Sequence, residues 1–128
     1  MVVVLIDTNV LVYAAKYKID IFSEIRKKFG LAAIRIPTAV LTELENISKK
    51  AKKGADKQAA KLALQLIRAA RITEIDIGDS TVDDAIVEWA RRHDAVVITN
   101  DVGLKYKLKK AGVPVYCLRQ KKLLEFWT

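Results

Sequence analysis

The sequence is poor in several residues that carry common catalytic and structural chemistries. Its 128 residues include one cysteine, one histidine and two prolines. The lone Cys117 cannot form an internal disulfide, and its place in the apolar run 113–118 favours a small buried side chain over a reactive thiol. The lone His93 excludes mechanisms that need paired histidines, and its position at the end of a predicted helix favours packing over metal binding.

Long hydrophobic runs are also absent. No apolar stretch approaches the roughly 18 residues of a membrane-spanning helix, and the chain begins with a predicted strand instead of the segments of a signal peptide. We therefore expect a cytoplasmic protein with no membrane partner. Because 52% of the residues are hydrophobic, the chain can bury a core, and we expect one domain over residues 1–128.

Acidic residues are the minority among the charged side chains. The sequence has 23 Lys and Arg against 15 Asp and Glu, for a net charge of +8. Such a surplus favours an anionic partner. Nucleic acid is the leading candidate, ahead of an acidic protein, while an anionic membrane fits least well because no long basic amphipathic anchor is present.

The hydrophobic periodicity alternates between strand and helix along the whole chain. This alternation predicts an α/β fold with a mostly parallel sheet and helices on both faces. In the second predicted hairpin helix we expect Leu62, Leu66 and Ala69 to point inward. The predicted strands cover residues 2–7, 33–36, 72–77, 95–99 and 113–118, and the predicted helices cover about 9–30, from 38 to the polar stretch 49–57, 55–70, 81–93 and 102–111.

Acidic residues stand where apolar strands end. Asp7 follows the first strand and Asp101 follows the fourth, while Glu43 and Asp83 lie near the starts of predicted helices. In an open α/β sheet, ligands bind in the crevice outside the carboxyl ends of the strands. These side chains are therefore placed to meet at one edge of the sheet.

Each acid also has a purely structural explanation. Asp7 and Asp101 are suitable helix N-caps, and acids in a first turn suit the helix dipole. Against this, the helical phase places Glu43 on one stripe with Val40 and Ile47 and places Asp83 at the border of an apolar face, so we expect both to be shielded from free solvent. Converging carboxylates need a cation to stay ionised together. Oxygen ligands without His or Cys favour Mg²⁺ or Mn²⁺.

Four motifs together resemble the PIN domain family. They are Asp7-Thr8-Asn9, Val40-Leu41-Thr42-Glu43-Leu44, Asp83-Asp84-Ala85-Ile86-Val87 with Ala90, and Thr99-Asn100-Asp101. Each motif is common by itself, but their order and spacing match from Met1 to about Leu118. The resemblance implies a three-layer α/β/α fold and a divalent-metal-dependent endoribonuclease.

The resemblance also implies roles for individual residues. The catalytic and metal-binding acids would be Asp7, Glu43, Asp83 and Asp101, with Thr8, Asn9 and Thr99 fixing the carboxylates by hydrogen bonds. Asp84 is an alternative to Asp83. The spacing to the fourth motif favours Asp83, and the helical phase independently places Asp83 nearer the core face than Asp84. Many members carry a further acid where this chain has Gly103, which leaves a second metal position less certain than the first.

Lysines and tyrosines are the expected contacts to RNA. The predicted RNA-binding lysines are Lys49, Lys50, Lys52, Lys53, Lys57, Lys105 and Lys109, with Lys110 beside them. They could track a single-stranded phosphate backbone, although solvated helix faces are the alternative. Stacking on bases is open to Tyr13, Tyr17 and Tyr106, for which packing is the more common role.

Two other functions are open at this point. One is a non-catalytic PIN-like module that binds RNA or a protein in ribosome assembly. The other is a receiver-like signalling domain, which fits poorly because the central strands end at Pro37 and Gly78 instead of at a phosphoacceptor aspartate. Within the PIN family, the resemblance leaves open a toxin with an antitoxin partner or a protein of ribosomal RNA processing. Pairing into a homodimer is a further expectation.

Overall fold

A six-stranded sheet organises the chain in the computed structural model, which describes residues 1–78, 82–119 and 123–127. The strand order is β3-β2-β1-β4-β5-β6, and every neighbouring pair is parallel except β5 and β6. The N-terminal strand is therefore central. The strands are β1 (Val2–Ile6), β2 (Ala32–Pro37), β3 (Thr73–Ile75), β4 (Val96–Ile98), β5 (Val115–Arg119) and β6 (Leu123–Phe126).

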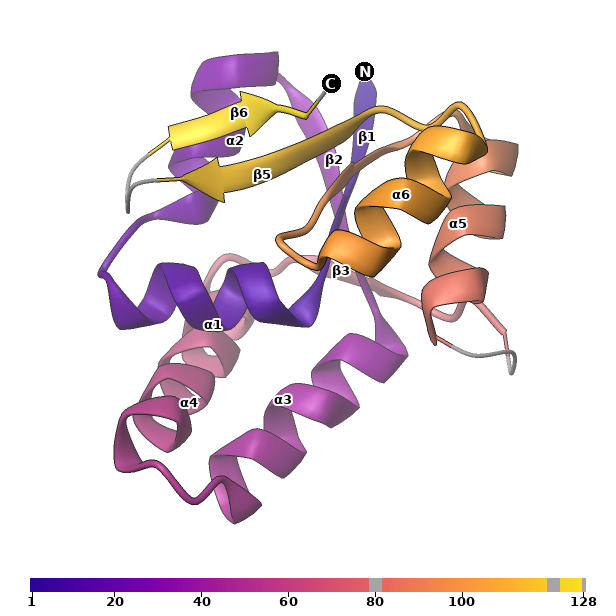
Figure 1. Ribbon diagram of the computed structural model, residues 1–128. Helices are drawn as coiled ribbons and strands as arrows, with labels where there is room; N and C mark the ends of the chain where they lie inside the picture. The colour runs from indigo at the N-terminus through magenta and orange to yellow at the C-terminus, as the bar shows by residue number, and fades with distance from the viewer. Residues whose placement is uncertain (79–81, 120–122, 128) are drawn as a thin grey trace.

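Helices cover both faces of this sheet (Figure 1). The described helices are α1 (Thr8–Lys16), α2 (Ile21–Phe29), α3 (Thr38–Lys50), α4 (Gly54–Ala69), α5 (Val82–His93) and α6 (Val102–Lys110). The core shared by α1 to α4 lies on one face, and the core under α5 and α6 lies on the other. The predicted three-layer α/β/α fold with a mostly parallel sheet is confirmed.

The continuous apolar run of β1 follows from this central position. Val4 and Ile6 belong to the core under α1 to α4, whereas Leu5 belongs to the core under α5 and α6. Successive side chains of a strand point to opposite faces, so a strand covered on both faces needs apolar residues at every position. The chain then leaves the sheet at Asp7, directly after the last buried position.

The single helix predicted over residues 9–30 is wrong, because two helices occupy this range. Helix α1 ends at Lys16, and Lys18 adopts a left-handed backbone conformation with φ of 56°. Asp20 then caps α2 by accepting a hydrogen bond of 3.1 Å from the Ser23 backbone N–H. Both helices bury apolar residues in the same core, so the hydrophobic pattern continues across the break and conceals it.

The inward face predicted for α4 is also wrong. Leu62 and Leu66 are 36% and 42% exposed, and Ala69 is exposed as well. Alanines form much of the buried face because α4 packs against both α1 and α3, and small side chains allow helices to approach closely. The buried residues of α4 are Ala59, Ala60, Ala63, Leu64 and Ile67.

The remaining differences lie at element ends. The strand predicted over residues 72–77 is shorter, the one predicted over 113–118 is shifted toward the C-terminus, and β6 was not predicted. Positions 79–81, where the helix predicted over 81–93 was expected to begin, lie outside the described residues. Within the described ranges, no helix is both long and apolar enough to cross a bilayer.

Candidate functional site

Asp7 lies at the centre of the candidate site, at the carboxyl end of β1. Its Oδ1 accepts a hydrogen bond of 2.8 Å from the Thr8 backbone N–H, and its Oδ2 accepts one of 2.8 Å from the Thr99 hydroxyl. Burial raises the pKa of the Asp7 carboxyl above its ordinary value. The two hydrogen bonds oppose this rise in pKa, while the negative charges of Glu43 and Asp83 add to it.

Thr99 connects Asp7 to Asp101. The Thr99 side chain is fully buried, and its hydroxyl also accepts a hydrogen bond of 3.1 Å from the Asp101 backbone N–H. The parallel register pairs Ile6 with Ile98, so the residues that follow these two strands are neighbours. The carboxyl ends of β1 and β4 therefore present Asp7 and Asp101 at the same edge of the sheet, as the sequence predicts.

Asp101 has a structural role as well as its place in the site. Its side chain caps α6 by accepting a hydrogen bond of 2.8 Å from the Leu104 backbone N–H. Asp7 is likewise the N-cap of α1. The capping explanation is therefore correct for both residues, and it does not exclude a second role because a carboxylate has several acceptor positions.

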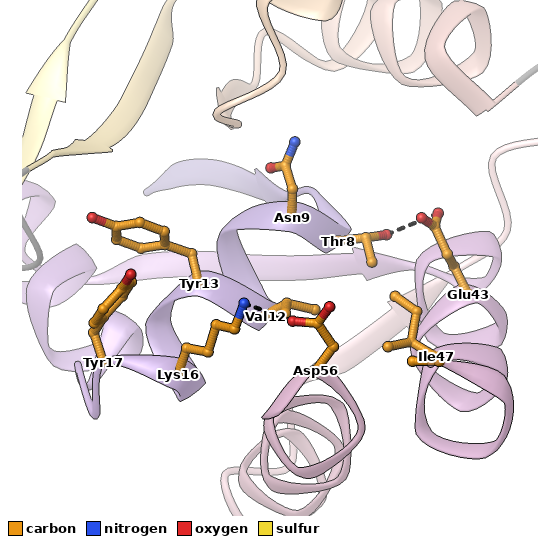
Figure 2. Close-up of a pocket in the computed structure, with 10 residues that line it drawn as sticks. Thr8, Asn9, Val12, Tyr13, Lys16, Tyr17, Glu43, Ile47 and Asp56 are labelled. Atoms are coloured by element: carbon orange, nitrogen blue, oxygen red, sulfur yellow. Dashed lines mark hydrogen bonds and ion pairs between the residues drawn. The ribbon is translucent and has the colours of Figure 1, made fainter. Parts of the chain in front are cut away.

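Glu43 joins the site from α3. Its Oε2 accepts a hydrogen bond of 3.1 Å from the hydroxyl of the buried Thr8. The expectation that Glu43 is shielded from solvent is wrong, since the residue is exposed. Its neighbour Leu44 is fully buried. Glu43 is therefore on the side of α3 that faces the open space beside α1 (Figure 2).

The two acids of α5 lie in different surroundings. Asp83 is half-buried, and its charge contributes to the raised pKa of Asp7. Asp84 is exposed and forms a salt bridge of 3.4 Å with Lys107 on α6. This difference agrees with the helical phase that favoured Asp83 over Asp84, and it brings Asp83 rather than Asp84 toward the site.

Two asparagine side chains accept hydrogen bonds from backbone groups near the ends of neighbouring strands. Asn9 Oδ1 accepts a hydrogen bond of 3.1 Å from the Asn100 backbone N–H, and Asn100 Oδ1 accepts one of 2.9 Å from the Leu118 backbone N–H. Sequence reasoning assigned no role to Asn100. Its position directly before Asp101 was the available signal, because the first motif also has an asparagine, Asn9, two residues after Asp7.

The carboxylate oxygens of the candidate site are suitable ligands for a divalent cation, but the side chains are not arranged as a preformed metal-binding cluster. Within the described ranges, no three His, Cys, Asp or Glu side chains lie together as a ready metal-binding group. Asp7 is nevertheless a half-buried carboxylate close to two other negative charges, and a cation would stabilise its ionised form. A Cβ atom at Gly103 would lie 3.3 Å from Asp101 Oδ1, so glycine keeps open the space beside that carboxylate. The residues that would hold a cation are Asp7, Glu43, Asp83 and Asp101.

A cavity of about 400 Å³ begins beside Glu43, one of the four candidate acids (Figure 2). Thr8 and Glu43 mark the end near the candidate site, and Tyr13 and Tyr17 line it from farther along α1. We call this cavity the α1–α3 groove. Its walls come from α1, α3 and the start of α4.

The predicted RNA-binding lysines divide into two groups. Those at the end of α3 and in the turn before α4 lie at the tip of the helical hairpin (Figure 1). Lys105 is instead 9% exposed, with its Nζ 5.8 Å from the centre of the Trp127 ring. Lys109 approaches the same ring at 5.4 Å. The exposed lysines of the hairpin tip are Lys49, Lys50, Lys52 and Lys53, while Lys57 is half-buried.

Known proteins match the chain over nearly its whole length. "Ribonuclease VapC4" of Methanocaldococcus jannaschii is 36% identical over 124 residues, covering 94% of this chain and 93% of that protein. "rRNA-processing protein FCF1" of Saccharomyces cerevisiae is 31% identical over 120 residues, covering 88% of this chain but 57% of that protein.

Structural similarity agrees with these sequence matches. The solved structure of the PIN domain endonuclease Utp24 aligns with a TM-score of 0.79 and 25% identity, covering 98% of this chain and 92% of that one. The family described as "PIN like domain" matches residues 4–121. The matched range includes Asp7, Glu43, Asp83 and Asp101, the four acids at the strand ends and helix starts. This chain belongs to the PIN-like domain family.

Proposed function

We propose that this protein is a divalent-metal-dependent endoribonuclease, acting as one domain over residues 1–128 in the cytoplasm. The observation that carries the proposal is the hydrogen-bonded series from Glu43 through Thr8 and Asp7 to Thr99 and the Asp101 backbone. It links three acids from three separate elements at one edge of the sheet. Relatives of the chain are named as a ribonuclease and as a PIN domain endonuclease, which supports the same reaction class.

The reaction is hydrolysis of a phosphodiester bond. One water attacks the phosphorus, the bond to the leaving oxygen breaks, and a phosphomonoester and a hydroxyl are produced. A divalent cation, Mg²⁺ or Mn²⁺, would supply electrostatic stabilisation of the charge that develops on the phosphoryl group. Asp7 and Asp101 would hold the principal ion, and Glu43 and Asp83 would orient the attacking water or complete a second ion site.

The surrounding hydrogen bonds would fix the carboxylates in place. The Thr99 hydroxyl holds Asp7 Oδ2, and the Thr8 hydroxyl holds Glu43 Oε2. Restricting ligand rotamers in this way is how outer hydrogen bonds tune metal sites. Asn9 supports the same arrangement by holding the backbone of Asn100 next to Asp101.

A cleavage assay on single-stranded and structured RNA tests the proposal. We expect cutting with Mg²⁺ or Mn²⁺, none with EDTA, and a loss of at least about 100-fold in Asp7→Asn, because a neutral amide does not replace an anionic ligand. Asp94→Asn is the matched control, since Asp94 has a left-handed φ of 52° that asparagine also tolerates. Full activity of Asp7→Asn, or cleavage that persists in EDTA, would contradict the proposal.

The second candidate is a non-catalytic module that binds RNA or a ribosome-assembly protein. Two observations favour it: Asp7 and Asp101 already serve as helix caps, and no ready metal-binding group is present among the described side chains. In this case the protein would bind RNA tightly but would not cleave it in the presence of Mg²⁺ or Mn²⁺. The same assay, combined with a binding measurement, separates the two functions.

Two biological settings follow from the relatives, and cut-site mapping distinguishes them. One relative is named an rRNA-processing protein, and cutting at a discrete site in ribosomal RNA would place this chain in ribosomal RNA processing. The other setting is that of a toxin neutralised by an antitoxin, for which VapC4 is the relevant relative. We propose a homodimer as the assembled form, which sedimentation of the purified protein can check.

A further inference from the structure

One face of α1 and one face of α3 form the two walls of the α1–α3 groove. Glu43 and Ile47 of α3 and its C-cap residue Ala51 line one wall at intervals of four residues. Helix α1 contributes a matching stripe that runs from Thr8 to Tyr17. Residues three to four apart share a helix face, so both walls continue from the acids outward. The groove therefore leads directly away from the candidate catalytic site (Figure 2).

The far part of the groove is aromatic and apolar. Tyr13 and Tyr17 lie with their ring centres 4.7 Å apart, and their planes are inclined by 58°. Tyr17 is 42% exposed, although it lies in a wall of the groove. Val12 and Ile47 add aliphatic surface. Tyrosine rings and aliphatic side chains form the kind of surface on which unstacked nucleobases pack.

The charge of the groove indicates which part of a nucleotide it accepts. Lys16 and Asp56 form a salt bridge of 2.6 Å, so their charges largely cancel. Glu43 then leaves the lining with a net charge of −1, because no other lining residue is charged. In the absence of a cation this lining would repel a phosphate, whereas the amino and hydroxyl groups of a base and ribose can donate hydrogen bonds to the carboxylate oxygens. The chemistry favours a base and its sugar.

The surroundings of the groove match the path of an RNA strand. Ala51 lines the groove, and the exposed Lys50 and Lys52 are its direct neighbours in the chain. Lysines at the hairpin tip can neutralise backbone phosphates outside the groove. At the other end, Glu43 connects the groove to Asp7 through Thr8.

We propose that the α1–α3 groove is a binding site for one unpaired nucleotide of RNA, the neighbour of the phosphate that is cut. Its base stacks on Tyr13 and Tyr17. This inference rests on the proposed ribonuclease function. The site accepts only an unpaired base, because a base held in a duplex is stacked and paired and cannot enter the groove.

Nucleoside binding tests the groove without the reaction. Adenosine, guanosine, cytidine and uridine carry no phosphate, so their binding is independent of metal and of cleavage. We expect chemical-shift changes in the NMR signals of Val12, Ile47 and Tyr17 of the full chain when a nucleoside is added. Ala51→Phe fills the groove and should abolish these changes, while the spectrum away from the groove reports that the variant is folded.

Steady-state kinetics on RNA supplies the second readout. Tyr17→Ala should raise KM for single-stranded RNA by about tenfold, as expected for loss of one stacked base, and leave kcat nearly unchanged. Leu66→Ala is the matched control, since Leu66 on α4 is 42% exposed, as Tyr17 is, and does not line the groove. It should leave KM unchanged.

The outcomes separate this proposal from the proposed function. Cleavage by the wild type with no nucleoside binding and an unchanged KM in Tyr17→Ala would overturn the groove assignment and leave the ribonuclease standing. Nucleoside binding that Ala51→Phe abolishes, in a protein that never cleaves RNA, would overturn the catalytic function instead. Equal cleavage of duplex and single-stranded RNA would also contradict the groove assignment, because a paired base cannot enter the groove.

Discussion

The Thr99 hydroxyl donates a 2.8 Å hydrogen bond to Asp7 Oδ2, joining residues that are 92 positions apart in the sequence. Thr99, which donates this hydrogen bond, is fully buried. It crosses from the end of β4 to the end of β1, and the same hydroxyl accepts the backbone N–H of Asp101. One small side chain therefore sets the orientation of one candidate metal ligand and the backbone of another.

Thr99→Val should reduce cleavage and stability together. The substitution keeps the shape of the side chain but removes the donor to Asp7 and leaves the Asp101 N–H without its acceptor. A hydrogen bond to a charged group, such as the one to Asp7, contributes about 1.5–3 kcal/mol, so we expect the free energy of unfolding in urea to fall by about that amount.

Thr99→Ser is the matched control for this position. Serine retains the hydroxyl, so it should recover most of the cleavage rate while losing only a methyl group. If Thr99→Val and Thr99→Ser have the same kcat, then orientation of Asp7 by the hydroxyl does not contribute to catalysis.

Gly103→Ala should weaken cleavage and leave stability nearly unchanged, because the gain in helix propensity is opposed by displacement of the Asp101 carboxylate that caps α6. Replacing glycine with alanine in a helix contributes about 1 kcal/mol to stability. The new Cβ atom would lie 3.3 Å from Asp101 Oδ1, which must shift to accommodate it. Thermal unfolding and cleavage rates measure the two effects.

Gly54→Ala provides the comparison for Gly103→Ala. Gly54 is at the start of α4, and a Cβ atom there meets nothing within 4 Å. The control should gain stability without losing activity. Unchanged cleavage in Gly103→Ala would show that the space beside Asp101 has no catalytic importance.

The cap of α2 should make part of the stability depend on pH. The hydrogen bond from the Ser23 backbone N–H lowers the pKa of the Asp20 carboxyl below its ordinary value. A lowered folded-state pKa stabilises the protein above the unfolded-state pKa of about 4. The contribution is lost as the pH falls through the folded-state value.

Asp20→Ala should therefore cost about 1 kcal/mol at pH 7, as for loss of an N-cap. The difference from the wild type should shrink as the pH is lowered below about 4. Asp20→Asn retains a cap that does not titrate, so its advantage over Asp20→Ala should not change with pH. Urea unfolding from pH 7 to pH 2.5 measures all three proteins, and a constant difference between wild type and Asp20→Ala would count against the prediction.

Removal of the hairpin-tip charges should flatten the salt dependence of RNA affinity. Each lysine that contacts a single-stranded phosphate contributes about 0.7 to the slope of log K against log salt concentration. Replacing the four exposed lysines of the tip with glutamine should therefore lower the slope by up to about 3. The replaced residues are Lys49, Lys50, Lys52 and Lys53.

Lys27 and Lys28 serve as the control for the hairpin tip. Both are exposed on α2 and neither lines the groove. Their replacement with glutamine should change the slope little. If the slope per lysine falls equally in both variants, the positive charge acts through the whole surface and not through the tip.

Much of the fold could be predicted because its signals are local. The apolar run of β1 reflects burial on both faces, and Gly30, the residue after α2, was identified as the end of a helix. The break between α1 and α2 could not be read from periodicity, because both helices pack on one core. The exposure of Leu62 and Leu66 was equally hidden, since it depends on how closely α4 approaches its neighbours.

The sequence by itself determined the alternation of strands and helices and the placement of acids at strand ends. These follow from hydrophobic periodicity and from the rule that parallel strands end at one edge of a sheet. It also indicated that Asp83 lies nearer the core than Asp84, because helical phase is a local property. The family resemblance rests on the same motifs.

Only the tertiary structure decided which side chains touch. The hydrogen bonds from Thr99 to Asp7 and from Thr8 to Glu43 depend on strand register and on the angle at which α3 leaves the sheet. The groove beside Tyr13 and Tyr17 exists because faces of α1 and α3 are opposed in space. Contacts between distant segments are set by packing of the whole chain, and no local pattern encodes them.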